Sequence, residues 1–401
     1  MKRFWGSKVR DLAFGDYSQI LEFVAQKKGK VAPSQIGNFC GIRGFDHLEF
    51  YVGNAKQAAL FYSQAFGFTN TAYCGLETGN RKTVSYVMEQ GNIRLVLSAA
   101  LSGEHPIAKS VLKHGDTIGV LALEVADVTK AYEETTTRGA VAVISPTELE
   151  DPDGILGYCV IRGYGDVLIK FVERRNYIGV FAPGFVPRHQ EFSSVGLRLI
   201  DHVVGNVELG KMDFWAEFFA QTMGFNLLAH FDEETISTNY SSLRSKVMQD
   251  HTGRIKLPIN EPALGKGKSQ IQEFLEYHHG AGIQHVAFLT KDIVATVSQL
   301  KARGVEFLHV PKAYYDDLPR RVGKINESIA KLAELGILVD RDHHGYLLQI
   351  FTQPVGDRPT LFFEIIERHG SQGFGGGNFQ ALFEAIERQQ ARRGNLLLSN
   401  E

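Results

Sequence analysis

The segments FDHLEFYVGNAKQAALFYSQAFGF (45–68) and IDHVVGNVELGKMDFWAEFFAQTMGF (200–225) are related to each other, and this internal repeat decides the fold. Each segment predicts a short strand that carries Asp-His, followed by a loop and an amphipathic helix. A glycine, Gly67 in one copy and Gly224 in the other, ends the predicted helix. The chain therefore contains a duplicated strand–helix unit.

Two further pairs extend the repeat. The segment IGVLALEVADVTKAYEETTTRGA (118–140) matches IQHVAFLTKDIVATVSQLKARGV (283–305), and DVLIKFVERR (166–175) matches TLFFEIIERH (360–369). Residues 175–196, with two prolines and three glycines, predict a linker. We expect two related α+β domains over residues 1–180 and 195–401, each with curled mixed sheets built from two strand–helix–strands units.

Composition excludes several classes of partner. The 401 residues carry a formal net charge of −2, so no basic surface predicts nucleic acid or an anionic membrane as a partner. The three cysteines, Cys40, Cys74 and Cys159, form no CxxC pair, which argues against a disulfide framework or a zinc knuckle. Because no run of about 18 apolar residues occurs, we expect no membrane-spanning helix and a cytoplasmic location.

Comparison of the repeats identifies a candidate metal site. Three matched strand positions are occupied, N-terminal copy first, by His47 and His202, Val120 and His285, and Lys170 and Glu364. Only the C-terminal copy combines two histidines with a carboxylate, a set typical of non-haem iron(II) oxygenases. The sequence therefore predicts one iron(II) per chain, held by His202, His285 and Glu364.

Structural alternatives exist for each of these residues. A histidine on an apolar strand is more often a hydrogen-bonded core residue, and we adopt that interpretation for His47. Glu364 could instead form an ion pair with a buried Arg368. The pairs at 278–279 and 343–344 lie beside glycines and predict exposed turns rather than metal ligands.

The C-terminal segment combines glycines with an amphipathic helix. GFGGGNF (373–379) precedes a predicted helix whose apolar stripe includes Phe379 and Phe383, with Asn378 as a natural N-cap. One interpretation is a helix packed on the sheet. The other is a lid over the metal site that moves on a glycine hinge.

Several longer motifs carry a family resemblance. They are IDHVVGNV (200–207), LPINEP (257–262), KSQIQEFLEYHHGAGIQHVA (268–287), LLQIFTQP (347–354), LFFEIIERHG (361–370) and GFGGGNF (373–379). From about Gly44 to Arg393 the chain resembles the 4-hydroxyphenylpyruvate dioxygenase family of the vicinal-oxygen-chelate superfamily. The resemblance implies two tandem domains of that superfamily, each of two βαβββ modules forming an open barrel, plus a C-terminal helix.

The resemblance also implies site residues and a reaction. It places the iron on the same three ligands, and it implies a substrate pocket of Ser245, Pro258, Asn260, Gln270, Gln284, Gln349, Phe351, Phe362, Phe374, Asn378 and Phe379. Among these, Asn260, Gln349 and Phe351 are expected to be catalytic. The implied reaction converts 4-hydroxyphenylpyruvate and O₂ to homogentisate and CO₂ in tyrosine and phenylalanine catabolism, by a homo-oligomer (dimer or tetramer).

Three alternatives remain open on the sequence. A 4-hydroxymandelate synthase would begin the same chemistry but hydroxylate the benzylic carbon. An extradiol catechol dioxygenase would share the metal ligands. A metal-free binding module of the same fold would not be expected to keep all three ligands.

Overall fold

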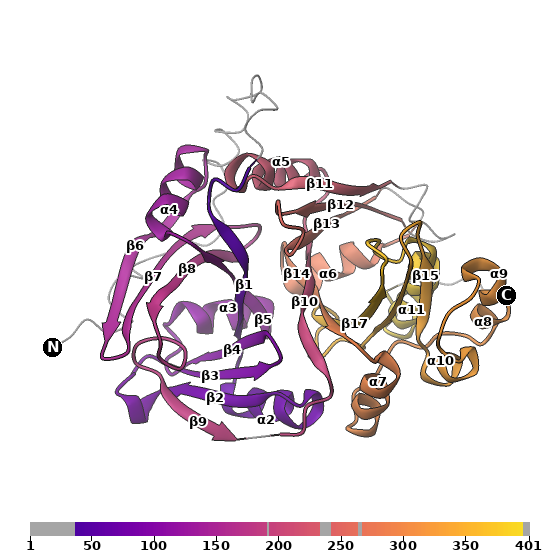
Figure 1. Cartoon of the computed structure of the whole chain (residues 1–401), viewed down its shortest axis with the longest axis horizontal. Coiled ribbons are helices and arrows are strands. Elements are labelled where there is room, and N and C mark those ends of the chain that lie inside the picture. Colours follow the sequence, from indigo (N-terminus) through magenta and orange to yellow (C-terminus); the bar gives the residue numbers. More distant parts are fainter. Residues whose placement is uncertain (1–36, 191, 233–241, 264–266, 396–401) are drawn as a thin grey trace.

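The computed structural model of the chain describes residues 37–190, 192–232, 242–263 and 267–395 (Figure 1). It contains two curled sheets that lie side by side, the first built from the indigo-to-magenta half of the chain and the second from the remainder. Residues 1–36 and 396–401, which the predicted domains include, lie outside the described residues.

The first sheet is formed by two βαβββ modules. The first module comprises β1 (Ile42–Tyr51), α2 (Ala55–Phe66), β2 (Thr69–Cys74), β3 (Thr83–Gln90) and β4 (Ile93–Ala100), with a 3₁₀ turn η2 (Leu76–Thr78). After α3 (Pro106–His114), the second comprises β5 (Thr117–Val125), α4 (Val128–Thr137), β6 (Ala142–Asp151), β7 (Gly154–Arg162) and β8 (Leu168–Tyr177). The strand order is β6-β7-β8-β5-β1-β4-β3-β2-β9, where β9 is Val186–Gln190.

The second sheet repeats this plan with an insertion. Its first module comprises β10 (Leu197–Asn206), α5 (Met212–Met223), β11 (Asn226–Phe231), β12 (Leu243–Gln249) and β13 (Lys256–Pro262). After α6 (Gln270–His278), the second comprises β14 (Gly282–Thr290), α7 (Ile293–Ala302), β15 (Leu338–Arg341), β16 (Tyr346–Phe351) and β17 (Phe362–His369). Between α7 and β15 lie α8 (Ala313–Asp316), α9 (Leu318–Val322) and α10 (Ile329–Leu335), and η3 (Gly376–Asn378) and α11 (Phe379–Arg392) follow β17.

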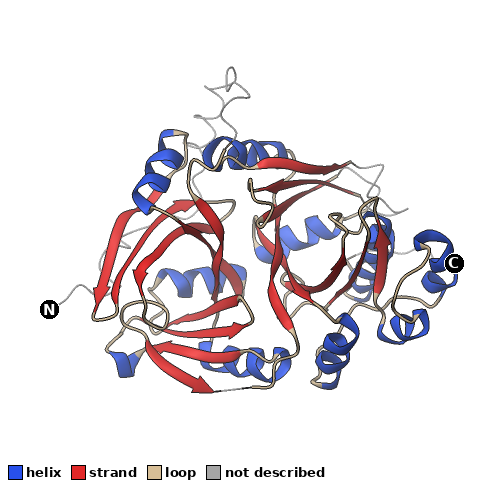
Figure 2. Cartoon of the chain, in the orientation of Figure 1, coloured by secondary structure: helices blue, strands red, loops and turns tan. Residues whose placement is uncertain are grey.

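Each half of the chain carries helices (blue in Figure 2) beside its strands, and local sequence signals account for the repeated ones. Asp127 and Asp292 each accept a hydrogen bond from a backbone N–H in the first turn of α4 and α7. Gly67 and Gly224 end α2 and α5 in the left-handed conformation, as the sequence predicted. These caps fix the helices at equivalent places in the two halves of the chain.

The strand register confirms the repeat at the level of single residues. In the first sheet Val120 pairs with Glu49 of β1, and in the second His285 pairs with Val204 of β10. The next strand places Lys170 beside Ala122 and Glu364 beside Ala287. The matched positions inferred from the sequence therefore occupy equivalent sites, and the predicted α+β fold with curled mixed sheets is confirmed.

Apolar side chains at the end of α2 and just after it pack against the second sheet. The rings of Phe66 and Phe363 lie 5.2 Å apart, and those of Phe68 and Phe288 lie 6.1 Å apart. Phe363 of β17 points into this shared core. Because side chains alternate along a strand, the next residue, Glu364, points to the opposite, concave face. The concave face of each sheet is thus available for a cavity.

The structure adds a strand to the predicted linker and corrects one predicted turn. The predicted linker contains β9, which pairs with β2 at the edge of the first sheet. His278, predicted in an exposed turn, is buried in α6, where its ring stacks on His114 at 4.3 Å. Among the described residues, no helix has the length and apolar character needed to cross a membrane.

Candidate metal centre and substrate pocket

Three neighbouring strands bring the predicted metal ligands together. His202 lies on β10, His285 on β14 and Glu364 on β17, and all three side chains are buried. The Nε2 atoms of His202 and His285 lie 3.1 and 3.6 Å from Oε2 of Glu364. One ligand atom from each residue lies within 4.8 Å of the other two. The structure therefore assembles one compact group from residues that are 83 and 79 positions apart.

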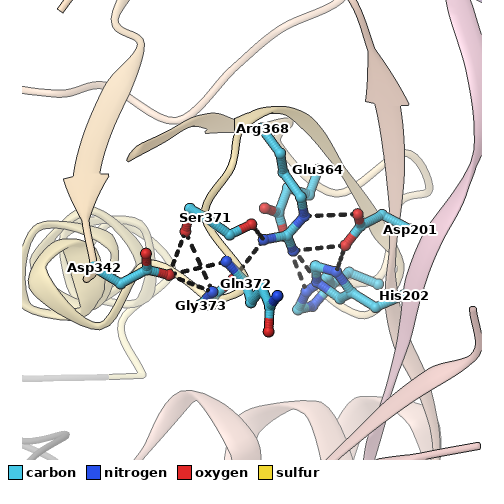
Figure 3. A network of polar contacts seen from close by, with 9 residues as sticks. Asp201, His202, Asp342, Glu364, Arg368, Ser371, Gln372 and Gly373 are labelled. Atoms are coloured by element: carbon cyan, nitrogen blue, oxygen red, sulfur yellow. Dashed lines mark hydrogen bonds and ion pairs between the residues drawn. The ribbon is translucent and has the colours of Figure 1, made fainter. Parts of the chain in front are cut away.

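Buried hydrogen bonds orient both histidine rings. Asp201 Oδ1 lies 2.8 Å from Nδ1 of His202, and Gln284 Oε1 lies 3.1 Å from Nδ1 of His285. Arg368 donates to both oxygens of Asp201 at 2.8 and 2.7 Å (Figure 3). With Nδ1 engaged, each ring directs Nε2 at Glu364, an arrangement common among metal-binding histidines.

Arg368 thus pairs with Asp201, so the suggested ion pair between Arg368 and Glu364 is wrong. Although burial disfavours a charged carboxylate, the two histidines hold the pKa of Glu364 below its usual value. Burial lowers the pKa of His285, whereas Glu364 and Asp201 outweigh burial and raise that of His202.

The three ligands fit a divalent transition metal. A buried carboxylate costs several kcal/mol unless a cation or hydrogen-bond donors compensate it. Two imidazole nitrogens and one carboxylate oxygen that converge on one point are the donor set of a non-haem metal site. The observation that decides this fit is the convergence of three buried donors on a single point.

A cavity of about 70 Å³ adjoins the predicted metal ligands. Nine of the residues predicted for the substrate pocket line it, namely Ser245, Pro258, Asn260, Gln270, Gln284, Phe351, Phe362, Phe374 and Phe379. Phe362 stacks on His285 with ring centroids 4.7 Å apart, and Phe374 meets His202 edge-on at 5.3 Å. The cavity therefore joins aromatic walls to a few polar groups, as ligand pockets do.

Gln349 and Asn378 lie beside this cavity rather than on its wall. Gln349 is on the concave face of β16, but the loop at Gly375 covers it. A Cβ atom at Gly375 would lie 2.1 Å from Gln349 Oε1, and its φ of 75° also requires glycine. Asn378 is fully buried and accepts a 2.6 Å hydrogen bond from Tyr314. Asn378 precedes α11 but its side chain makes no capping bond, so the predicted N-cap interaction is wrong.

Sequence reasoning missed part of the cavity wall. The additional lining residues are Val204, Phe231, Leu243, Val247, Leu382 and Phe383. Leu382 and Phe383 belong to the apolar stripe of α11, so the stripe was the signal for them. Phe231, Leu243 and Val247 come from β11 and β12, and only the curl of the sheet brings them to the cavity.

The glycine-rich segment before α11 is held by polar contacts. Asp342 accepts hydrogen bonds from the backbone of Gln372 and Gly373 and from the side chain of Ser371 (Figure 3). Asp340 accepts one from Gly377 at 3.0 Å. The segment predicted to be a mobile hinge is therefore fastened in this conformation, with α11 closing the cavity.

Two family models and several curated relatives match this chain. Residues 36–180 match the family model "Hydroxyphenylpyruvate dioxygenase, HPPD, N-terminal", and residues 199–350 match "Glyoxalase/Bleomycin resistance protein/Dioxygenase superfamily". A 4-hydroxyphenylpyruvate dioxygenase of Dictyostelium discoideum is 46% identical over 367 residues, covering 88% of this chain and 100% of the relative. One of Caenorhabditis elegans is 42% identical over 384 residues, covering 92% and 97%.

Among solved structures, a triple mutant of 4-hydroxymandelate synthase from Streptomyces coelicolor superposes with a TM-score of 0.79. Its sequence is 32% identical, and the match covers 87% of this chain and 99% of that one. The similarity in fold thus extends over both sheets.

Proposed function

The chain belongs to the 4-hydroxyphenylpyruvate dioxygenase family, and we propose that iron(II) held by His202, His285 and Glu364 carries its reaction. The enzyme is an oxidoreductase that combines 4-hydroxyphenylpyruvate with O₂ to give homogentisate and CO₂. Membership implies a non-haem metal, and the donor set favours iron(II) among such metals. The observation that supports the assignment is the convergence of three buried donors in the C-terminal sheet. The matched positions of the N-terminal repeat are His47, Val120 and Lys170.

The proposed iron would bind the keto acid and activate O₂, and the chain's own residues orient the ring and exclude water. We assign Phe351, Phe362 and Phe379 to the walls that hold the substrate ring. The hydroxyl and amide groups of Ser245, Asn260 and Gln284 can form hydrogen bonds with substrate oxygens without adding charge. Both atoms of O₂ are accounted for: one enters the carboxylate formed on decarboxylation and the other the ring hydroxyl.

The closed cavity supports a lid function for α11. Its volume of about 70 Å³ is small beside the roughly 300–1,000 Å³ of typical ligand pockets. Phe379, Leu382 and Phe383 of α11 form part of its wall. We therefore propose that α11 moves to admit the substrate and closes again to keep water from the reacting groups.

The decisive experiment is product identification with iron-loaded protein and 4-hydroxyphenylpyruvate. We expect homogentisate and CO₂ in equal amounts, one iron per chain, and loss of turnover on chelation that ferrous iron restores. Glu364→Ala is the control that should neither bind iron nor turn over. The assignment to iron would be wrong if rigorously iron-free protein turned over, and 4-hydroxymandelate as product would reject the dioxygenase outcome.

We also propose that the enzyme acts in the cytoplasm as a homo-oligomer. The three cysteines are free and buried, which suits a reducing compartment. Exposed apolar side chains such as Leu112 and Ile178 provide candidate contacts between subunits. Light scattering of the purified protein tests the oligomer.

A further inference from the structure

The first sheet encloses a cavity of about 620 Å³ on its concave face, far larger than the cavity at the metal ligands. Its base carries the buried side chains of His47, Glu49 and Lys170. Its volume lies within the range of roughly 300–1,000 Å³ found for small-molecule sites. A cavity of this size with buried charged groups at its base is unlike a simple packing defect.

This cavity is built as the counterpart of the substrate pocket. Asp46 binds the ring of His47 and accepts hydrogen bonds from Arg174, as Asp201 does with His202 and Arg368. Phe181 meets the His47 ring edge-on at 5.2 Å and 77°, and Phe374 meets His202 at 5.3 Å and 70°. The framework around the histidine has thus been retained in both sheets.

Polar wall positions are also retained. Ser85 pairs with Ser98 across β3 and β4, in the places that Ser245 and Asn260 occupy across β12 and β13. The two hydroxyls lie 2.8 Å apart, and Ser98 donates to Glu49 at 2.7 Å. A chain of hydrogen bonds therefore connects Ser85 and Glu49, both on the cavity wall, through the buried hydroxyl of Ser98.

The charges at the base differ from those of the metal site. Lys170 replaces Glu364, Val120 replaces His285, and Glu49 stands where the second sheet has Val204. Burial lowers the pKa of Lys170 and raises the pKa of Glu49. The opposite charge of each residue partly counteracts the effect of burial on the other. A ligand group of opposite charge would stabilise each of them, and a ligand without net charge would keep the pair balanced.

The remaining lining matches this requirement. Phe181, Phe185 and Val96 provide apolar wall. The lining also carries both signs of charge, from Arg81, Lys82, Glu148, Glu150 and Asp151. An anion or a cation alone would add a net charge to this buried and mutually balanced pair, which is costly. A zwitterion with an apolar side chain can pair one charged group with Lys170 and the other with Glu49, and its side chain can pack against the apolar wall.

We propose that the N-terminal cavity binds a free α-amino acid with an aromatic or large aliphatic side chain. Its carboxylate lies against Lys170, its ammonium group lies against Glu49, and its side chain contacts Phe181 and Phe185. The site needs no metal, because the ammonium group of Lys170 supplies the positive charge. The catalytic centre in the other sheet is a separate site.

The test is calorimetric titration of the full-length protein with L-phenylalanine as probe. We expect one molecule per chain, and binding about tenfold weaker or less for 3-phenylpropanoate and 2-phenylethylamine, which each lack one charge. Lys170→Met and Glu49→Gln should each weaken binding by about tenfold or more. Glu364→Ala, which alters only the metal site, should bind L-phenylalanine as the unchanged protein does.

A further variant leaves the buried charges unchanged, so its result does not depend on whether the Lys170 and Glu49 variants fold. Leu149 is half-buried on the cavity wall, so Leu149→Trp should fill the cavity while keeping iron content and turnover. We expect this variant to lose L-phenylalanine binding. Binding that survives Leu149→Trp but is lost in Phe374→Ala would place the amino acid in the catalytic pocket, and no binding at millimolar concentration would equally overturn the proposal.

Discussion

Asp201→Asn and Asp46→Asn form a matched pair of substitutions that separates metal binding from folding. Asp201 Oδ1 lies 2.8 Å from His202 Nδ1, and its carboxylate accepts from Arg368 at 2.8 and 2.7 Å. Asp46 occupies the same place beside His47 and Arg174, whose Nη2 donates at 2.9 Å. Neighbouring arginine and histidine outweigh burial and hold the pKa of both carboxyls far below the usual range.

Asparagine at either position replaces one carboxylate oxygen with an NH₂ group. The NH₂ group cannot accept the hydrogen bond that the neighbouring arginine or histidine donates to that oxygen. Breaking a buried, hydrogen-bonded ion pair costs about 3–5 kcal/mol, and we expect a similar loss of unfolding free energy in both variants. Only Asp201 orients a proposed metal ligand, and loss of such a contact weakens metal binding by about 10–100-fold. Asp46→Asn should therefore keep the iron affinity of the unchanged protein.

The assays are urea unfolding of the iron-free proteins and anaerobic equilibrium dialysis against ferrous iron. Equal losses of stability together with a loss of iron affinity in Asp201→Asn alone would support the reasoning. If Asp46→Asn lost iron as fully as Asp201→Asn, the assignment of the metal to the second sheet would be refuted. Normal iron binding by Asp201→Asn would refute the role of Asp201 in orienting His202.

Glu364→Ala should abolish iron binding and turnover with the fold intact by circular dichroism, whereas His47→Ala should keep both and lose only stability; equal iron loss in the two would contradict the repeat argument. Truncation after Gln372 should keep the metal ligands yet lower the homogentisate-to-CO₂ ratio, because α11 no longer holds the ring; an unchanged ratio would reject the lid. Burial and His114 lower the pKa of His278 to about 3, so the unfolded chain binds a proton between pH 6.5 and 3 that the folded chain does not. The free energy of unfolding should therefore fall on acidification from pH 7 to 5, and His278 should account for about 2 kcal/mol of that fall. His278→Gln should lose less unfolding free energy between the two pH values, as measured by urea titration at each.

The sequence by itself determined the repeat, the fold class and the three residues that converge. Alternation along a strand is a local property, so His202, His285 and Glu364 could be assigned to inward faces from their neighbours alone. Comparison of the two repeats then showed that only the C-terminal copy can hold a metal, because the N-terminal copy has Val120 and Lys170 at two of the three matched positions. The resemblance named nine residues that the structure places on the cavity wall.

Only the tertiary structure decided how loops and helices close on these sheets. The burial of His278 depends on His114, 164 residues away, and the position of Asn378 depends on Tyr314, 64 residues away. Local patterns carry no information on such contacts, so an exposed turn and a helix cap were predicted instead. The N-terminal cavity, which Phe181 and Phe185 help to line, likewise depends on tertiary packing. Period-two alternation fixes which face of a strand a side chain takes but not what lies opposite it.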